Sequence, residues 1–249
     1  MSLTGKIAIV SGAGAGLGRS SALKLAAKGA TVLVTDIADD NGNETVRMIT
    51  DAGGTAAYRH VDSSSSQENQ SLVDHIVETY GKLDIAVNNA GVAPPSTPFA
   101  EVSDEIWKRT ISINLDGVFY AMRSQINAMR KTSAGGVIIN MASILGQIGF
   151  PGMASYVAAK HGVVGLTKQV AVDHAKDGIR AIAIGPAFIK TGLEDALAPE
   201  DRAALDDQHP VGRMGEPEEI GDVVASVADP TWSFVNGAYL PVDGGFLSR

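Results

Sequence analysis

Short apolar runs alternate along this chain with longer segments in which apolar residues recur at helical spacing. The apolar runs, each typical of a strand, cover residues 6–10, 31–35, 56–60, 83–87, 137–141, 180–184 and 239–242, and the helical segments cover residues 19–27, 42–52, 67–80, 103–129 and 155–175. This alternation predicts a parallel sheet with helices on both faces, because parallel neighbours need a crossover connection. No linker divides the chain, so we expect a single α/β domain over residues 1–249 with a Rossmann-type doubly wound parallel sheet.

Composition narrows the class of protein. The 249 residues are 45% hydrophobic, which suits one large core, and the absence of cysteine excludes disulfides, thiolate metal sites and a thiol nucleophile. The five histidines show no paired ligand spacing, so we expect no required metal. A formal net charge of −8 argues against a nucleic-acid surface or an anionic membrane partner. With no cleavable or membrane-spanning apolar segment in the sequence, we expect a cytoplasmic protein.

A glycine-rich turn lies between the first expected strand and the first helix. It reads Ser11-Gly-Ala-Gly-Ala-Gly-Leu-Gly18. Glycines let the backbone approach a pyrophosphate, and the free N–H groups at the start of a helix bind the anion. The spacing differs from GxGxxG, and no Gly-Lys-Ser/Thr follows, which excludes a nucleoside-triphosphate loop. We expect Gly12, Gly16, Leu17 and Gly18 to hold a dinucleotide.

Asp36 indicates which nicotinamide cofactor the protein uses. It ends the second expected strand about twenty residues beyond the glycine turn, where a carboxylate accepts hydrogen bonds from the adenosine ribose. A 2′-phosphate here would meet a negative charge, and Ile37, Ala13 and Ala15 supply no cation to replace it. Arg19 is the one candidate near the turn. The sequence therefore favours NAD over NADP, unless Asp36 merely caps the strand.

Tyr156 and Lys160 stand four residues apart in an expected helix, which places the phenol and the ammonium on one face. An unperturbed tyrosine has a pKa of roughly 10, so a nearby cation is needed to favour the phenolate that accepts a proton at pH 7. Ser143 follows a buried apolar run, where the carboxyl end of a strand faces the usual ligand cleft. The spacing alone is weak evidence, because such pairs also occur on surface helices.

Several motifs occur together in one order along the chain. They are Ser11-Gly12-x3-Gly16-x-Gly18, Asn88-Asn89-Ala90-Gly91, Asn114, Ser143, Tyr156-x3-Lys160 and Val242-Asp243-Gly244-Gly245. Taken together they resemble the short-chain dehydrogenase/reductase family, and the resemblance covers nearly the whole chain. It implies a nicotinamide-dependent oxidoreductase, with NAD as cofactor in view of Asp36. It also implies a homotetramer that acts on a small-molecule alcohol or ketone.

The resemblance further implies a role for each motif residue. Tyr156 would exchange the substrate hydroxyl proton, Lys160 would lower its pKa and bind the nicotinamide ribose, and Ser143 would hold the substrate oxygen. Asn114 would anchor a water that links Lys160 to solvent. Alternatively, Asn114 satisfies a helix kink and Ser143 caps a turn. The other residues expected to contact the cofactor are Asp62 at the adenine, Asn89, Ala90 and Gly91 in the turn beside the cofactor, and Pro186, Ile189 and Thr191 near the nicotinamide.

The chain departs from the family pattern at Ser63, which follows Asp62 where an apolar residue is usual, and at two positions in and after the sixth expected strand. Ala187 replaces the usual glycine of a Pro-Gly pair, where a positive φ would strain a side chain. Ile182 replaces an asparagine common in the sixth strand. We also expect residues 191–209, which show no single period, to cover the substrate and to place Leu193 and Leu197 against it.

Three functions remain open on the sequence alone. The first is an NAD-dependent dehydrogenase of fairly apolar secondary alcohols, including cyclic alcohols and dihydrodiols. The second is a reductase of the 3-oxoacyl carrier-protein type, against which Asp36 counts because such enzymes normally use NADPH. The third is a non-catalytic nucleotide-binding regulator, which has less reason to keep the Ser143, Tyr156 and Lys160 group. Candidates to line an apolar substrate pocket are Ile144, Leu145, Phe150, Pro151, Met153 and Phe188.

Overall fold

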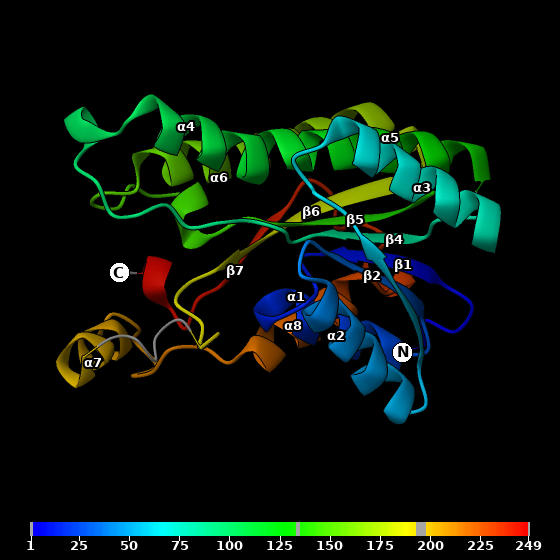
Figure 1. Cartoon of the computed structure of the whole chain (residues 1–249), viewed down its shortest axis with the longest axis horizontal. Helices are drawn as coiled ribbons and strands as arrows, with labels where there is room; N and C mark the ends of the chain where they lie inside the picture. Colours follow the sequence, from blue (N-terminus) through cyan, green and yellow to red (C-terminus); the bar gives the residue numbers. More distant parts are fainter. Residues whose placement is uncertain (1, 133–134, 193–197, 249) are drawn as a thin grey trace.

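The computed structural model describes residues 2–132, 135–192 and 198–248, and in this part of the chain seven parallel strands form one sheet (Figure 1). The strands are β1 (Ile7–Ser11), β2 (Thr31–Asp36), β3 (Thr55–His60), β4 (Ile85–Asn88), β5 (Gly136–Met141), β6 (Ile179–Pro186) and β7 (Tyr239–Val242). Their order is β3-β2-β1-β4-β5-β6-β7. The sheet therefore extends in both directions from the neighbouring pair β1 and β4, which is the expected doubly wound arrangement.

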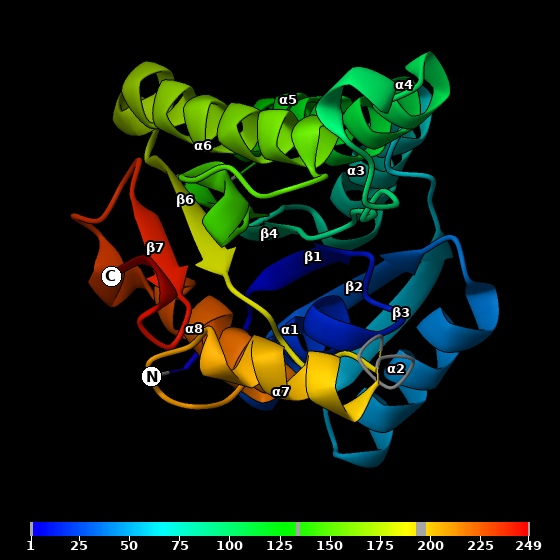
Figure 2. The same ribbon diagram turned by 90° about the vertical axis from the view of Figure 1, so that its left-hand side faces the viewer.

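Helices cover both faces of this sheet. They are α1 (Gly16–Ala27), α2 (Asp39–Asp51), α3 (Ser66–Tyr80), α4 (Asp104–Ile111), α5 (Gly117–Thr132), α6 (Ala154–His174), α7 (Pro199–Asp207) and α8 (Pro217–Val227). Figures 1 and 2 show α3, α4, α5 and α6 on one face and α1, α2 and α8 on the other. Helix α7 lies beyond the end of β6, at the edge of the sheet that faces the viewer in Figure 2.

The core consists of two apolar clusters, one on each face of the sheet. In β1, Ala8 and Val10 join the cluster under α1 and α8, whereas Ile7 and Ile9 join the cluster under α3 and α5. A strand buried on both faces must be apolar at nearly every position, which explains the continuous apolar runs in the sequence. Polar side chains consequently gather where the strands end, and the carboxyl ends share one edge.

The helical region expected over residues 103–129 is interrupted. Helix α4 ends at Ile111, a π-helical turn covers Ser112–Asp116, and α5 continues to Thr132. A π-helical turn inserts one extra residue, and such turns are frequent at functional sites. The residue pattern on either side remains helical, so the interruption left no trace in the apolar spacing.

Two further helices were not assigned from the sequence. Helix α7 lies inside residues 191–209, where Pro199 suits the first helical turn because its φ is already helical. Helix α8 begins with Pro217 inside a capping box formed by Glu216 and Glu219. The capping-box residues and the proline are visible in the sequence and could have predicted α8.

Candidate active site

A cleft of about 630 Å³ opens at the carboxyl edge of the sheet, beside the ends of β1 and β4. This is the point at which ligands bind in doubly wound sheets. Among the residues predicted for the site, only Gly18 and Asn114 do not line the cleft, and each of them lies against a lining glycine. The predicted residues that line it are Gly12, Gly16, Leu17, Asp36, Asp62, Asn89, Ala90, Gly91, Ser143, Tyr156, Lys160, Pro186, Ile189 and Thr191.

Several lining residues were not predicted. They are apolar or small neighbours of the motif residues, and their position next to a motif was the only signal that the sequence offered. The unpredicted side chains include Val61, Val92, Ala93, Ile113 and Met141. Of the residues proposed for an apolar substrate pocket, Phe188 lines the cleft, whereas Ile144 and Leu145 are buried and lie outside the cleft lining.

The glycine turn after β1 is held against the turn after β4. Gly12 has a φ of 61°, and a Cβ there would lie 2.8 Å from the Cα of Ala90, so only glycine fits. A Cβ on Gly18 would lie 2.1 Å from the carbonyl oxygen of Gly12, so this glycine lets α1 pack directly beneath the turn. The side-chain amide of Asn89 donates to the Ser11 and Gly12 carbonyls, both at 3.0 Å. These contacts form a backbone cradle at the N-terminus of α1, which suits a phosphate.

Asp36 stands at the end of β2 and lines the cleft. Its Oδ2 accepts the Gly14 N–H at 2.8 Å and its Oδ1 accepts the Ala38 N–H at 2.9 Å, which holds the carboxylate beside the glycine turn. A carboxylate has about four lone-pair sites, so acceptor capacity remains for hydroxyl groups. The Arg19 guanidinium is hydrogen-bonded within the protein: it donates to the Gly14 carbonyl and, at 3.0 Å, to Thr45 Oγ1.

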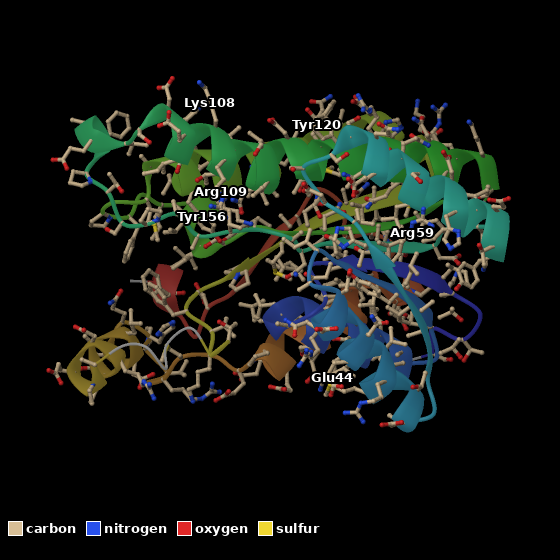
Figure 3. All side chains as sticks on the ribbon, in the orientation of Figure 1. Glu44, Arg59, Lys108, Arg109, Tyr120 and Tyr156 are labelled. Carbon is tan, nitrogen blue, oxygen red and sulfur yellow. The ribbon has the colours of Figure 1, made fainter. Side chains whose placement is uncertain are left out.

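Ser143, Tyr156 and Lys160 meet in the cleft, and Figure 3 shows Tyr156 on the side of the molecule where α7 lies. The Ser143 side chain hydrogen-bonds Tyr156 and also accepts the Leu145 N–H at 3.2 Å, so it caps a turn as well. Lys160 Nζ lies 5.3 Å from the centroid of the Tyr156 ring and donates to the Met141 carbonyl at 2.7 Å. The spacing in α6 therefore brings phenol and ammonium to one face, as predicted.

Burial controls the proton affinities of these two groups. It raises the pKa of Tyr156 to about 12, against the opposing effect of the Ser143 hydrogen bond. It also lowers the pKa of Lys160 to about 8. The sequence led us to expect that Lys160 and a positively charged cofactor together lower the pKa of Tyr156, and this stays a prediction; here the Lys160 ammonium donates to the Met141 carbonyl. A phenolate at neutral pH therefore needs further positive charge close to Tyr156.

Asn114 lies in the π-helical turn and is fully buried. Both hydrogens of its amide are committed, one to the Val92 carbonyl and one to the Thr110 carbonyl, each at 3.0 Å. Its Oδ1 accepts the Val92 N–H at 3.2 Å. The Asn114 side chain thus hydrogen-bonds a backbone carbonyl of the irregular helical region and links this region to the segment after Gly91. This matches the second of the two roles expected for Asn114.

The two departures in and after β6 have mild effects. Every described residue with positive φ is a glycine, so the loop gives Ala187 a conformation without that strain. Ile182 is fully buried in β6 opposite Ile139, where its side chain is part of the core. Leu193 and Leu197, which we expected to contact the substrate, lie outside the described residues.

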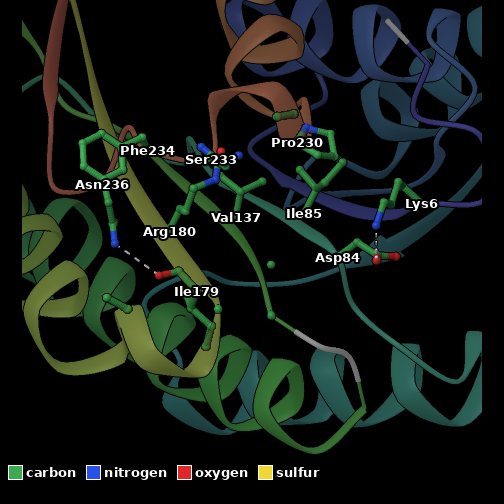
Figure 4. A pocket seen from close by; sticks show the side chains of 15 residues that line it. Lys6, Asp84, Ile85, Val137, Ile179, Arg180, Pro230, Ser233, Phe234 and Asn236 are labelled. Atoms are coloured by element: carbon green, nitrogen blue, oxygen red, sulfur yellow. Dashed lines mark hydrogen bonds and ion pairs between the residues drawn. The ribbon is translucent and has the colours of Figure 1, made fainter.

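A second hollow, of about 570 Å³, lies at the opposite edge of the sheet, near the amino ends of β4, β5 and β6 (Figure 4). Its charged side chains and Asn236 are engaged with each other or with the backbone. Lys6 pairs with Asp84 at 3.0 Å, Asn236 donates to the Ile179 carbonyl at 3.4 Å, and Arg180 donates to the Val227 carbonyl at 3.0 Å. We therefore place the chemistry in the cleft at the carboxyl edge.

Within residues 2–132, 135–192 and 198–248, no three histidine or acidic side chains are grouped as a metal site would require. In those residues, no helix combines the length and the apolar character needed to cross a bilayer.

The doubly wound sheet, the glycine cradle and the Ser143, Tyr156 and Lys160 group define a dinucleotide-binding oxidoreductase. Residues 12–247 match a family profile described as enoyl-(acyl carrier protein) reductase. The chain is 41% identical to cyclohexanol dehydrogenase of Acinetobacter sp. (strain SE19), over 98% of this chain and 96% of that protein. The chain belongs to the short-chain dehydrogenase/reductase family.

Two further proteins are similar over nearly their whole length. Cis-4-hydroxycyclohexanecarboxylate dehydrogenase of Sinomonas cyclohexanicum is 37% identical over 98% of this chain and 97% of that protein. The crystal structure of a putative short-chain alcohol dehydrogenase from Sinorhizobium meliloti 1021 superimposes with a TM-score of 0.94 at 31% identity, covering 100% of this chain and 98% of that one. Sequence and fold therefore agree on the family.

Proposed function

We propose that this protein is an NAD-dependent dehydrogenase that interconverts a fairly apolar, cyclic secondary alcohol and the corresponding ketone. The observation that carries the proposal is the grouping of Ser143, Tyr156 and Lys160 in the same cleft as the glycine cradle. Relatives named for cyclohexanol and for cis-4-hydroxycyclohexanecarboxylate support a ring as the substrate class.

The cleft fits a dinucleotide on the evidence of its own backbone. The positions of Gly12 and Gly18 leave no room for side chains, so phosphate oxygens can approach the N–H groups at the start of α1. Asp36 supplies a carboxylate for the adenosine ribose and repels a 2′-phosphate, which favours NAD over NADP. Asp62, Asn89, Pro186, Ile189 and Thr191 would complete the contacts along the cleft.

In this proposal, Tyr156 is the proton acceptor in alcohol oxidation and the proton donor in ketone reduction. Ser143, which already hydrogen-bonds Tyr156, would bind the substrate oxygen beside it. When bound, NAD supplies the hydride acceptor and a positive charge, which favours the phenolate of a buried tyrosine. Lys160 would turn from the Met141 carbonyl toward the ribose and add a second positive charge.

The walls of the cleft suit an apolar substrate. Phe188 lines it and packs edge to face against Phe150, with 5.9 Å between the ring centroids. Phe150 follows Ser143 on the loop that leads to α6, so an aromatic pair joins the two segments beside the reacting group. Such a wall suits contact with the hydrocarbon ring of a substrate.

The substitution Tyr156→Phe tests the assignment of the acid/base group. Removal of the hydroxyl should lower turnover of cyclohexanol with NAD by about 10²–10⁴-fold, the usual contribution of such a group. Binding of NADH, followed by fluorescence titration, should stay close to that of the unaltered protein. A variant that keeps more than about a tenth of the turnover would exclude Tyr156 as the acid/base.

A reductase of 3-oxoacyl carrier-protein thioesters is the second candidate function, because a 3-oxoacyl-[acyl-carrier-protein] reductase of Thermotoga maritima is 33% identical over 99% of this chain. A side-by-side assay separates the two. The proposed dehydrogenase should oxidise cyclic alcohols with NAD, whereas the alternative should reduce 3-oxoacyl thioesters and prefer NADPH.

We also propose a cytoplasmic homotetramer. Helices α4, α5 and α6 share one face of the molecule, and on them Trp107 and Phe119 are each 43% exposed and Val172 is 78% exposed. Apolar side chains exposed on one helical layer favour association through two-fold axes.

A further inference from the structure

The side chains of Tyr58, Asp39 and His60 form a hydrogen-bonded group next to the backbone of Asp36. The Tyr58 hydroxyl on β3 is 2.8 Å from the Asp36 carbonyl oxygen and 2.7 Å from Asp39 Oδ1. His60 Nδ1 is also 2.7 Å from Asp39 Oδ1. One phenol oxygen therefore connects the end of β2, which carries Asp36, to the first residue of α2, which carries Asp39.

The surrounding backbone is shaped to hold Tyr58 in this place. A Cβ on Gly42 would lie 2.1 Å from the Tyr58 ring, so the ring packs on bare backbone of α2. Strand register pairs Asp36 with His60, which puts the imidazole beside the same turn. Burial and the Asp39 carboxylate raise the pKa of Tyr58, so its hydroxyl stays a donor at neutral pH.

The group brings a second carboxylate to the turn that carries Asp36. Asp36 lines the cleft, and the shared phenol oxygen holds Asp39 Oδ1 within a few ångströms of the Asp36 backbone. Tyr58 and His60 each hydrogen-bond Asp39 and lower the pKa of its carboxyl, which keeps it ionised. A dianionic 2′-phosphate near Asp36 would therefore meet the charge of Asp36, which lines the cleft, and, farther away, that of Asp39, which His60 offsets in part when its imidazole is protonated.

We propose that Asp39 is a second determinant of cofactor selectivity and that Tyr58 is the residue that positions it together with Asp36. This inference rests on the proposed NAD-binding function of the cleft. It assigns two separate effects. Asp39 repels the 2′-phosphate through its charge, and Tyr58 holds the turn in the geometry that binds NAD.

Matched variants separate charge from geometry. Asp39→Asn keeps an oxygen that accepts hydrogen bonds from Tyr58 and His60 but removes the charge. The control Asp40→Asn removes the same charge from the next residue of α2, which is also exposed. Affinities for NADH and NADPH are measured by fluorescence titration without substrate, so the readout does not depend on turnover.

Asp39→Asn should narrow the preference for NADH over NADPH by about fivefold, through tighter binding of NADPH, while Asp40→Asn should change it less than about twofold. Equal effects of the two variants, or no effect of Asp39→Asn, would overturn the role of Asp39. If the unaltered protein itself prefers NADPH, the proposed NAD function fails, and this outcome is read from the unaltered protein alone.

Tyr58→Phe tests the positioning role, because it removes only the hydroxyl. We expect the KM for NAD to rise about threefold or more while kcat at saturating NAD stays within about twofold, since positioning acts on cofactor binding. A lower melting temperature with an unchanged KM would show that Tyr58 is only structural and would overturn its role.

Discussion

Replacement of Lys160 by methionine is expected to stabilise the fold while it abolishes activity. Lys160 is 3% exposed, and its ammonium donates to the Met141 carbonyl at 2.7 Å. Burial lowers its pKa from 10.5 to about 8, so the folded protein holds a charge that water would solvate better. Methionine has a similar length and flexibility and carries no charge.

The size of the effect follows from the pKa shift. Each pKa unit corresponds to about 1.4 kcal/mol, so the buried ammonium destabilises the folded state by about 3 kcal/mol at pH 7. The variant leaves the Met141 carbonyl without this donor, which costs about 1–2 kcal/mol. The net gain is then about 1–2 kcal/mol, or a rise in melting temperature of roughly 2–8 °C for a chain of this length.

The dependence on pH gives the sharper test. A base whose pKa is depressed on folding binds fewer protons in the folded state, so the stability of the unaltered protein rises with pH. The penalty is complete below pH 8 and disappears as the pH approaches 10.5, the ordinary lysine value. The advantage of Lys160→Met should therefore be present at pH 7 and nearly gone at pH 9.5.

Thermal and urea unfolding at both pH values, at one protein concentration, measure this difference. Lys168→Met is the matched control, because Lys168 is an exposed lysine on the same helix, α6. Its effect on stability should be equal at the two pH values. If Lys160→Met is less stable than the unaltered protein by the same amount at pH 7 and pH 9.5, the buried charge carries no penalty and the reasoning is refuted.

Four further expectations concern the cofactor, the proton, the assembly and α7. Asp36→Ala should lower the ratio of kcat/KM with NAD to kcat/KM with NADP. An unchanged ratio would show that Asp36 does not contact the ribose. Burial raises the pKa of Tyr156 to about 12, so the fraction of Tyr156 present as phenolate grows with pH. The rate of alcohol oxidation should therefore rise between pH 7 and 10, while the rate of ketone reduction stays nearly constant. An oxidation rate that does not depend on pH contradicts this expectation. Light scattering at micromolar concentration should give the mass of a tetramer, and a mass near 25.8 kDa would exclude association. Amide hydrogen exchange in α7 (Pro199–Asp207) should slow when NAD and an inhibitor bind together, and equal exchange in both states would identify α7 as a fixed wall.

The sequence by itself determined the α/β fold class and the motif residues that line most of the cleft, although not their apolar neighbours. These features depend on local rules. Apolar runs specify buried parallel strands, glycines specify where a backbone must pass closely, and a four-residue spacing specifies one face of a helix. The ordered motifs from Gly12 to Lys160 therefore predicted which residues meet in the cleft, because each sits at a fixed place relative to a strand end.

Only the tertiary structure decided the properties that depend on neighbours distant in the sequence. The raised pKa of Tyr156 and the lowered pKa of Lys160 follow from burial under surrounding elements, which no local pattern reports. The π-helical turn at Asn114 depends on hydrogen bonds to Val92, and the contact of Tyr58 with Asp36 and Asp39 depends on strand register. Desolvation depends on all the atoms that surround a group, and strand register depends on how whole strands pair. Both are therefore set only once the fold has brought these residues together.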